Sequence, residues 1–186
     1  GVGYHALGGI TSGNKCTALG MASGDAMVGN QNSTTIGYNA QASSNSVDNE
    51  FTLGDNNINA LRCNDQSIAA LSDGRDKTDV VDLPHGLDFI NQTRPVRFKW
   101  DIRDGQPGQG KQGTTNYGFI AQELLEIGNN EEHRLVYESN PDKLEARYNN
   151  LIPMLTKAIQ ELSAKNDSLE TSNQALIARI EALENA

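Results

Sequence analysis

Ser72-Asp73-Gly74-Arg75-Asp76-Lys77 is the stretch at which this sequence changes character, and it decides how the chain divides. Before it lies a segment rich in Gly, Asn, Ser and Thr, and after it come a mixed apolar and charged segment and then a heptad pattern. A serine and a lysine brought together in a folded protein can form a nucleophile and base pair, so self-cleavage at this junction is our first hypothesis. The alternative is that Ser72-Asp73 is only a turn or a helix cap.

The segment before the junction is built from a repeat. Glycine recurs at intervals of 17 residues, at Gly3, Gly20, Gly37 and Gly54, and the residue before each of these glycines is apolar. Turn-forming residues separate these positions, which is typical of short strands in a stacked β architecture whose units cannot bury their apolar face alone. We therefore predict a β stalk of 17-residue repeats over residues 1–65, which must stack or trimerise. A disordered low-complexity linker is the alternative.

The last segment, residues 151–186, follows a heptad pattern. Its apolar positions alternate in steps of three and four, which is the a and d pattern of a coiled coil. The core positions that we predict are Ile152, Leu155, Ile159, Leu162, Asn166, Leu169, Asn173, Leu176, Ile180 and Leu183. The two asparagines stand at a positions, where a polar residue fixes the register at a cost in stability. Heptads alone do not distinguish a dimer from a trimer, and an amphipathic helix packed on its own domain is the alternative.

Residues 66–150 have the pattern of a small α+β domain. Residues 83–90 predict a short helix, residues 95–100 alternate like a strand, and residues 117–124 run from a strand into a helix. Gly105 to Thr115 contains four glycines and predicts a hairpin or a flexible loop. The fold class that follows is mixed α+β.

Four blocks of this sequence resemble the peptidase S74 family, the C-terminal intramolecular chaperone and autoprocessing domain of phage tailspikes, endosialidases, tail fibres and neck appendages. The family motif Ser-Asp-x-Arg-x-Lys is matched by Ser72, Asp73, Arg75 and Lys77. The later blocks are residues 94–100, 117–123 and 151–162. The repeat before the junction resembles the head and stalk repeats of YadA-like adhesins and phage tail fibres.

This resemblance implies a fibrous homotrimer that folds its own N-terminal fibre as the client and then cuts itself off. It implies a tail fibre or appendage of a virion, assembled in the host cytoplasm, which would meet a host receptor through upstream regions. Carried over to this chain, the scissile bond is Leu71–Ser72, with Ser72 as the nucleophile and Lys77 as the base. A non-cleaving trimeric adhesin or fibre stalk with a coiled-coil anchor is the alternative.

The chemistry requires a neutral amine, because only an uncharged lysine can take the proton of the serine hydroxyl. Burial, or the nearby charge of Arg75, would favour the neutral form of Lys77. Asp76 stands where the family often has an apolar residue, and Asp79 begins a pair that is more usually Asn-Ile. These two acids would favour the charged lysine and slow the reaction.

Further residues of the matched blocks are expected to support the site. Asp73 belongs to the motif itself, and Gln122 and Glu123 end the block at residues 117–123. The oxyanion formed during attack needs a hydrogen-bond donor, and Gln122 or a backbone amide near Gly74 is our candidate.

The composition excludes several other classes of function. A net charge of −9 argues against a nucleic-acid partner or an anionic membrane surface, and no apolar run approaches the length of a spanning helix, so we expect a soluble chain. We expect no metal and no cofactor: two cysteines are too few for a zinc site, and His5, His85 and His133 are scattered along the chain. Glu131-Glu132 is expected to be solvated loop charge. A hydrophobic content of 37% is lean for a monomeric core, and the chain begins inside a repeat, so we expect a piece of a longer oligomeric protein.

Overall fold

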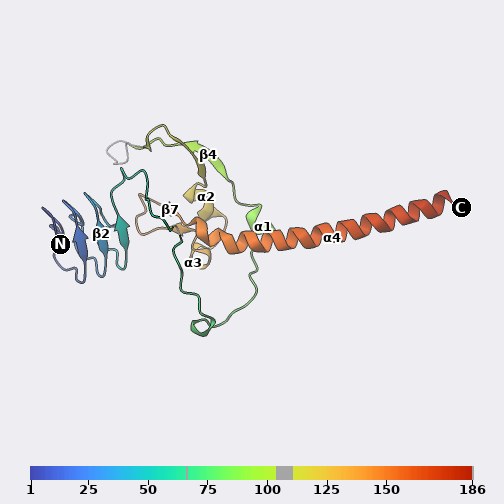
Figure 1. The fold of residues 1–186 in the computed structure, drawn as a ribbon, viewed down its shortest axis with the longest axis horizontal. Helices are drawn as coiled ribbons and strands as arrows, with labels where there is room; N and C mark the ends of the chain where they lie inside the picture. The colour runs from blue at the N-terminus through green and yellow to red at the C-terminus, as the bar shows by residue number, and fades with distance from the viewer. Residues whose placement is uncertain (66, 104–110, 186) are drawn as a thin grey trace. The chain divides into compact units, whose positions relative to one another are not determined.

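A computed structural model describes residues 1–65, 67–103 and 111–185, and it confirms a mixed α+β chain (Figure 1). The chain forms two compact units that interleave along the sequence. The first comprises Gly1–Ala70, Pro95–Gly118 and Tyr137–Glu145, and the second comprises Leu71–Arg94, Phe119–Val136 and Ala146–Ala186. The division into domains at residues 1–65, 66–150 and 151–186 stays a prediction.

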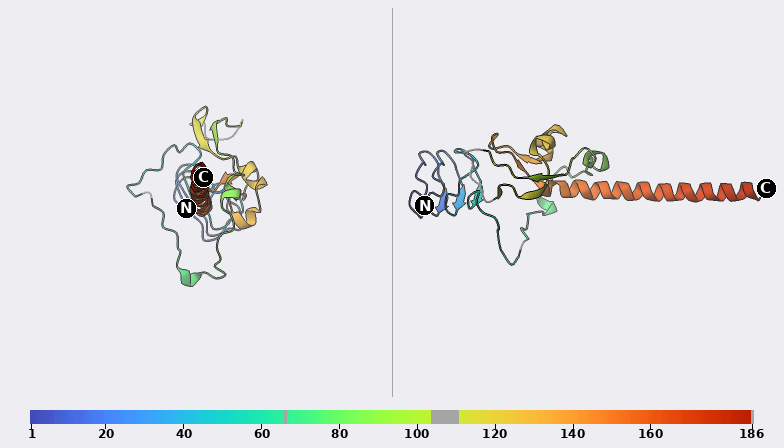
Figure 2. Two further views of the ribbon diagram at one scale, coloured as in Figure 1. Left: turned by 90° about the vertical axis from the view of Figure 1, so that its right-hand side faces the viewer. Right: turned by 90° about the horizontal axis from the view of Figure 1, so that it is seen from above.

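The repeat forms a three-stranded parallel sheet in the first unit, made of β1 (Thr17–Leu19), β2 (Thr34–Ile36) and β3 (Phe51–Leu53) (Figure 2). Thr17 pairs with Thr34 and Thr34 with Phe51, so the offset between neighbouring strands equals the period of the glycines. Three of the four repeats therefore contribute one strand each to the stack, and Val2 of the first forms an isolated bridge with Leu19.

The repeated glycine is required by the backbone that follows each strand. Gly3, Gly20 and Gly37 have φ of 136°, 126° and 122°, a region that side chains disfavour. A Cβ on Gly20 would also lie 2.5 Å from the carbonyl oxygen of Gly37. The glycines thus permit the close stacking of one repeat on the next.

The interior of the repeat holds both apolar and polar side chains, and Met27 is buried there. Ser23, Asn30 and Thr35 are completely buried, and their side chains bond to neighbouring turns. The Ser23 hydroxyl donates to the Thr35 carbonyl at 2.8 Å, and the Asn30 amide donates to the Val47 carbonyl at 2.7 Å. Leu19, by contrast, leaves about half of its side chain in solvent. An exposed apolar residue in each turn is what a stalk of several chains would cover, and that assembly stays a prediction.

The rest of the first unit is a hairpin and a returning loop. β4 (Val96–Lys99) pairs with β5 (Thr115–Gly118) in an antiparallel sheet, as the alternation at residues 95–100 predicts. Most of the predicted hairpin or loop from Gly105 to Thr115 lies outside the described residues. The antiparallel pairing of β4 with β5 fits the hairpin, and Thr115 is the first residue of β5. Two further strands, β6 (Val136–Tyr137) and β7 (Glu145–Ala146), form a two-stranded sheet.

The second unit is mainly helical. Its short elements are the 3-10 turn η1 (Gly74–Asp76), α1 (Leu87–Ile90), α2 (Ala121–Glu126), α3 (Asn130–His133) and η3 (Tyr148–Asn150). They precede α4 (Leu151–Glu184), which packs on α1. The backbone N–H of Leu87 donates to the carboxylate of Glu161 at 2.7 Å, which fixes the start of α1 on α4. Phe89, Leu124 and Met154 are buried in this unit.

Helix α4 separates two apolar faces. Leu151, Met154 and Ala158 are buried within the second unit. The predicted a and d positions face solvent instead: Ile159, Leu162 and Leu169 are exposed by 66%, 54% and 55%. The alternative of a helix whose whole apolar stripe packs on its own domain therefore fails for these positions, and the coiled coil that would cover them stays a prediction. None of the helices in the described residues is long and apolar enough to cross a membrane.

Candidate functional site

A tight turn brings the predicted serine and lysine together. Asp73 caps η1 by accepting a hydrogen bond from the backbone N–H of Arg75 at 2.9 Å, and the backbone N–H of Lys77 donates to the Gly74 carbonyl at 3.3 Å. This local reversal returns the long side chain of Lys77 to Ser72, where Nζ donates to Oγ at 2.6 Å. The cap and the contact between Ser72 and Lys77 are thus parts of one structure, and the roles of the two residues as nucleophile and base stay a prediction.

Arg75 is engaged by the capping residue. Its guanidinium contacts the Asp73 carboxylate through Nε at 3.0 Å and through a terminal nitrogen at 2.5 Å. The side-chain hydrogen bond from Arg75 holds the pKa of Asp73 below its usual range, and the same bond raises the pKa of Arg75. Because the arginine charge is offset by this carboxylate, Arg75 is a weaker source of repulsion on Lys77 than its position in the motif suggests.

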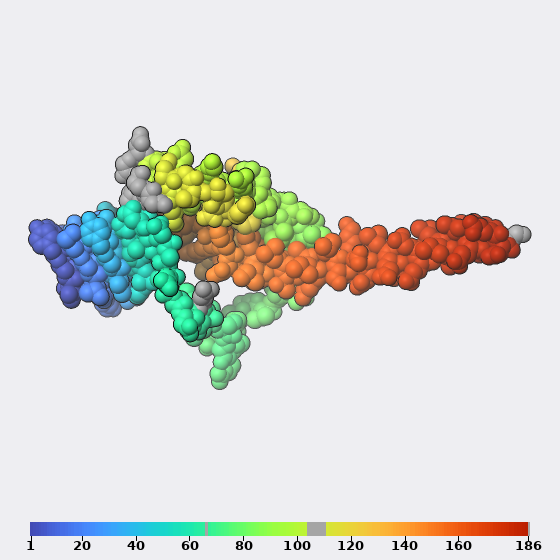
Figure 3. All heavy atoms as spheres, turned by 45° about the horizontal axis from the view of Figure 1, so that its top comes forward, coloured from blue at the N-terminus to red at the C-terminus, as the bar shows by residue number. Residues whose placement is uncertain are grey.

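The pair lies in an exposed stretch. Every residue from 71 to 82 is exposed, and the segment around residue 75 is a thin green run of atoms in Figure 3. Within the described parts of the chain, no carboxylate lies within ion-pair distance of Lys77. The expected ion pairing of Lys77 with Asp76 or Asp79 is therefore not observed. Leu71, Val80 and Val81 present apolar surface on both sides of the pair.

Comparison with known families gives an assignment for this part of the chain. Residues 72–133 match the model of the peptidase S74 family, described as the chaperone of endosialidase. The chain contains a peptidase S74 segment. The match begins at Ser72 and includes Lys77. No curated protein and no solved structure matches the chain significantly.

The S74 segment holds Gln122 and Glu123 on α2, and the two differ in their contacts. Glu123 forms a two-pronged ion pair with Arg94, in which Nε donates to Oε2 at 3.0 Å, and this bond raises the pKa of Arg94. Glu123 therefore ties α2 to the chain before β4. Among the described residues, the side chain of Gln122 makes no hydrogen bond, and neither residue bonds to Ser72. The role of Gln122 as oxyanion donor stays a prediction.

Two of the three histidines, which are scattered along the sequence and were expected to be surface or structural residues, come together in the fold. His85 and His133 meet ring to ring with centroids 4.3 Å apart, and both contact the ring of Phe89. Glu132, which we expected to be solvated loop charge, lies with an oxygen 3.2 Å from Nε2 of His85. Burial, and then the neighbouring His85, lower the pKa of His133.

No sequence signal pointed to this cluster. His85 and Glu132 are separated by 47 positions, and no ligand motif joins them. The contact depends on how α1 and α3 pack in the second unit, which local patterns do not encode.

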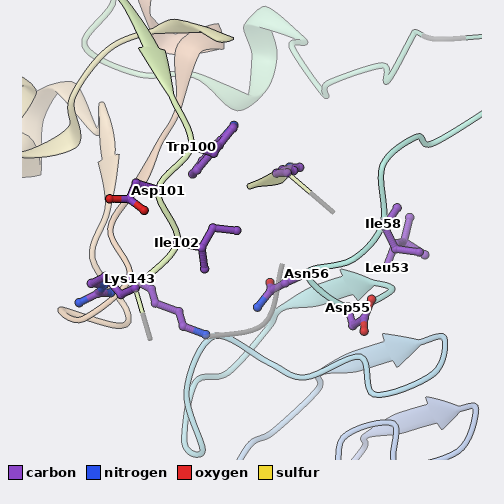
Figure 4. A pocket seen from close by; sticks show the side chains of 10 residues that line it. Leu53, Asp55, Asn56, Ile58, Trp100, Asp101, Ile102 and Lys143 are labelled. Carbon is purple, nitrogen blue, oxygen red and sulfur yellow. The ribbon is translucent and has the colours of Figure 1, made fainter. Parts of the chain in front are cut away.

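The first unit also carries a hollow of about 480 Å³ (Figure 4). Asn56, Trp100, Asp101, Lys111 and Lys143 are among its lining residues. The ammonium of Lys111 lies 5.5 Å from the centre of the Trp100 ring and occupies its face. Among the described lining residues, Asp101, Lys111 and Lys143 offer charged groups, and none is a serine, cysteine or histidine.

Proposed function

We propose that this chain is an intramolecular chaperone that trimerises, folds the phage tail fibre or tailspike that carries it, and then cuts itself between Leu71 and Ser72. The observation that carries the proposal is the 2.6 Å contact between Lys77 Nζ and Ser72 Oγ at the first residues of the S74 segment. The client is the protein's own N-terminal fibre. The folded product belongs to a virion appendage that is assembled in the host cytoplasm.

The chemistry uses the position of Ser72 directly after the carbonyl that it attacks. Neutral Lys77 takes the hydroxyl proton, and Oγ adds to the carbonyl carbon of Leu71 through a five-membered ring. The C–N bond then breaks, the amine of Ser72 receives the proton, and an ester joins Leu71 to Ser72 Oγ. Water hydrolyses this ester, which frees the Leu71 carboxylate and restores the serine hydroxyl. No separate substrate binding is needed.

Assembly supplies the condition for this reaction. A lysine in water has a pKa of about 10.4, so its neutral form costs about 4 kcal/mol near pH 7. Removal of water from a lysine lowers that cost, and in the single chain Lys77 and its surroundings are exposed. Chain association would bury two apolar surfaces. One is formed by Leu71, Val80 and Val81, and the other is the exposed seam of α4, meaning the apolar residues at its predicted a and d positions. Cleavage should follow assembly.

The test is to express the intact chain beside Ser72→Ala and Lys77→Arg and to measure the chain masses over time. Fragments of residues 1–71 and 72–186 are expected from the parent and from neither of these two variants. Alanine has no hydroxyl to attack the carbonyl, and arginine stays charged and cannot serve as the base. Ser67→Ala, which removes another exposed serine in the same region, is the matched control and should cleave like the parent. A parent chain that trimerises and stays intact would instead support the non-cleaving fibre stalk.

A further inference from the structure

We propose that His85, Glu132 and His133 bind a divalent transition-metal ion, with Zn²⁺ as the best match. The site is independent of Ser72 and Lys77. It would join the chain just before α1 to the end of α3 within the second unit.

The geometry is close to that of a metal site. One ligand atom from each of the three residues lies within 4.8 Å of the others. Zinc binds imidazole and carboxylate at about 2.0–2.2 Å, which places tetrahedral ligands about 3.3 Å apart. His85 Nε2 and Glu132 Oε1 already have that spacing, at 3.2 Å.

The donor set selects the class of ion. Two imidazoles and one carboxylate suit zinc and its first-row neighbours, whereas calcium and magnesium prefer oxygen ligands alone. Imidazole binds a metal in its neutral form, as free histidine largely is at neutral pH.

The surroundings hold the ligands and leave space for the ion. Phe89, which is buried, contacts both histidine rings and restricts their rotation. Gly128 lies against His133, and a Cβ there would come within 2.8 Å of Nε2. Glu132 is exposed on its outer side, with 59% of its side chain in solvent, so a water can complete a four-coordinate site.

The consequence would be a cross-link between segments far apart in the sequence. An ion that binds only the folded form stabilises it in proportion to its concentration above the dissociation constant. The competing explanation is that the histidines are packing partners of Phe89 and nothing more. In that case added metal leaves the stability of the chain unchanged.

The experiment uses the untagged full chain, stripped with a chelator and titrated with Co²⁺ and then with Zn²⁺. We expect one ion per chain, the visible absorption of four-coordinate cobalt, its loss when zinc displaces cobalt, and an upward shift in the melting temperature with Zn²⁺. His85→Gln, Glu132→Gln and His133→Gln should each weaken binding by about tenfold or more. His5→Gln is the matched control, because His5 is the one remaining histidine and lies outside the cluster.

Several results would overturn the proposal. These are the absence of cobalt absorption in the parent, binding that survives both His85→Gln and Glu132→Gln, or binding that His5→Gln abolishes. Glu132→Gln removes only an exposed carboxylate, so it keeps the test valid if a histidine variant fails to fold. Circular dichroism of each variant identifies such a failure. The readout does not involve cleavage, so its failure leaves the proposed function untouched.

Discussion

Weakening the exposed seam of α4 should slow self-cleavage even though the seam is far from Ser72 in the sequence. The perturbation is the double variant Leu162→Ala and Leu169→Ala. Both residues stand at predicted d positions, and they are 54% and 55% exposed in the single chain. The proposed trimer would bury what is still exposed.

The expected size follows from that exposure. Complete burial of a leucine side chain contributes about 1.5–3 kcal/mol, so the half still exposed contributes about 0.8–1.5 kcal/mol in each chain. Two positions in three chains give about 5–9 kcal/mol, of which truncation to alanine removes most. The assembly constant should fall by about a thousandfold or more. Because a trimer forms from three chains, the concentration at half-assembly then rises by about thirtyfold or more.

The assay pairs two measurements on the same samples. Sedimentation velocity over a range of chain concentrations gives the assembly midpoint, and intact mass gives the fraction cut at Leu71–Ser72 over time. The double variant should assemble and cleave only at the raised concentration. Gln174→Ala, an exposed change on the same helix outside the a and d positions, should behave like the parent.

Two outcomes would refute the reasoning. A double variant that remains monomeric and still cleaves at the parent rate would show that assembly does not activate Lys77. A variant that trimerises at the parent concentration would show that the exposed seam of α4 is not where the chains meet.

Three further changes test the packing inside each unit, measured by urea denaturation of the uncut chain. Gly20→Ala should destabilise the repeat by about 1–3 kcal/mol because its φ is positive and a Cβ meets the next turn, whereas Gly29→Ala, which has 3.4 Å of clearance, should be nearly neutral. Glu50→Ala should cost about 1–3 kcal/mol, since its carboxylate accepts hydrogen bonds from Ser43 and from Tyr137. Phe89→Ala should cost about 3–5 kcal/mol in the second unit, because this ring is buried. An unchanged midpoint in Gly20→Ala, Glu50→Ala or Phe89→Ala would contradict the corresponding contact.

The features that the sequence predicts well are those determined by short-range geometry. The period of the glycines equals the offset between neighbouring strands, because successive repeats supply successive strands. Each strand is followed by a glycine, whose backbone has a positive φ that other residues disfavour. The contact between Ser72 and Lys77 is equally local, since a capped turn of three residues returns one side chain to the other. The single helix from Leu151 to Glu184 follows from its heptad period, which continues through the two asparagines at a positions.

The features that the sequence does not predict depend on tertiary packing. The cluster of His85, Glu132 and His133 needs α1 and α3 to come together, and no spacing rule joins them. The pairing of Arg75 with Asp73 was also not predicted, because the sequence does not show which of the nearby charged residues Arg75 contacts. The motif also does not predict the exposure of Lys77, because its residues are the same whether the lysine is exposed to solvent or buried.

In the proposed reaction, the exposure of Lys77 in the single chain makes cleavage depend on assembly. Ser72 and Lys77 are already in contact in the single chain, so the proposed reaction would wait for assembly and not for this contact. Chain association would remove water from the pair and would bring three fibre chains to a high local concentration. Hydrolysis of the bond after Leu71 would then remove the segment that gathered the chains. The assembled fibre would have no equivalent path back, so its persistence would be set by the rate of unfolding and not by the equilibrium that formed it.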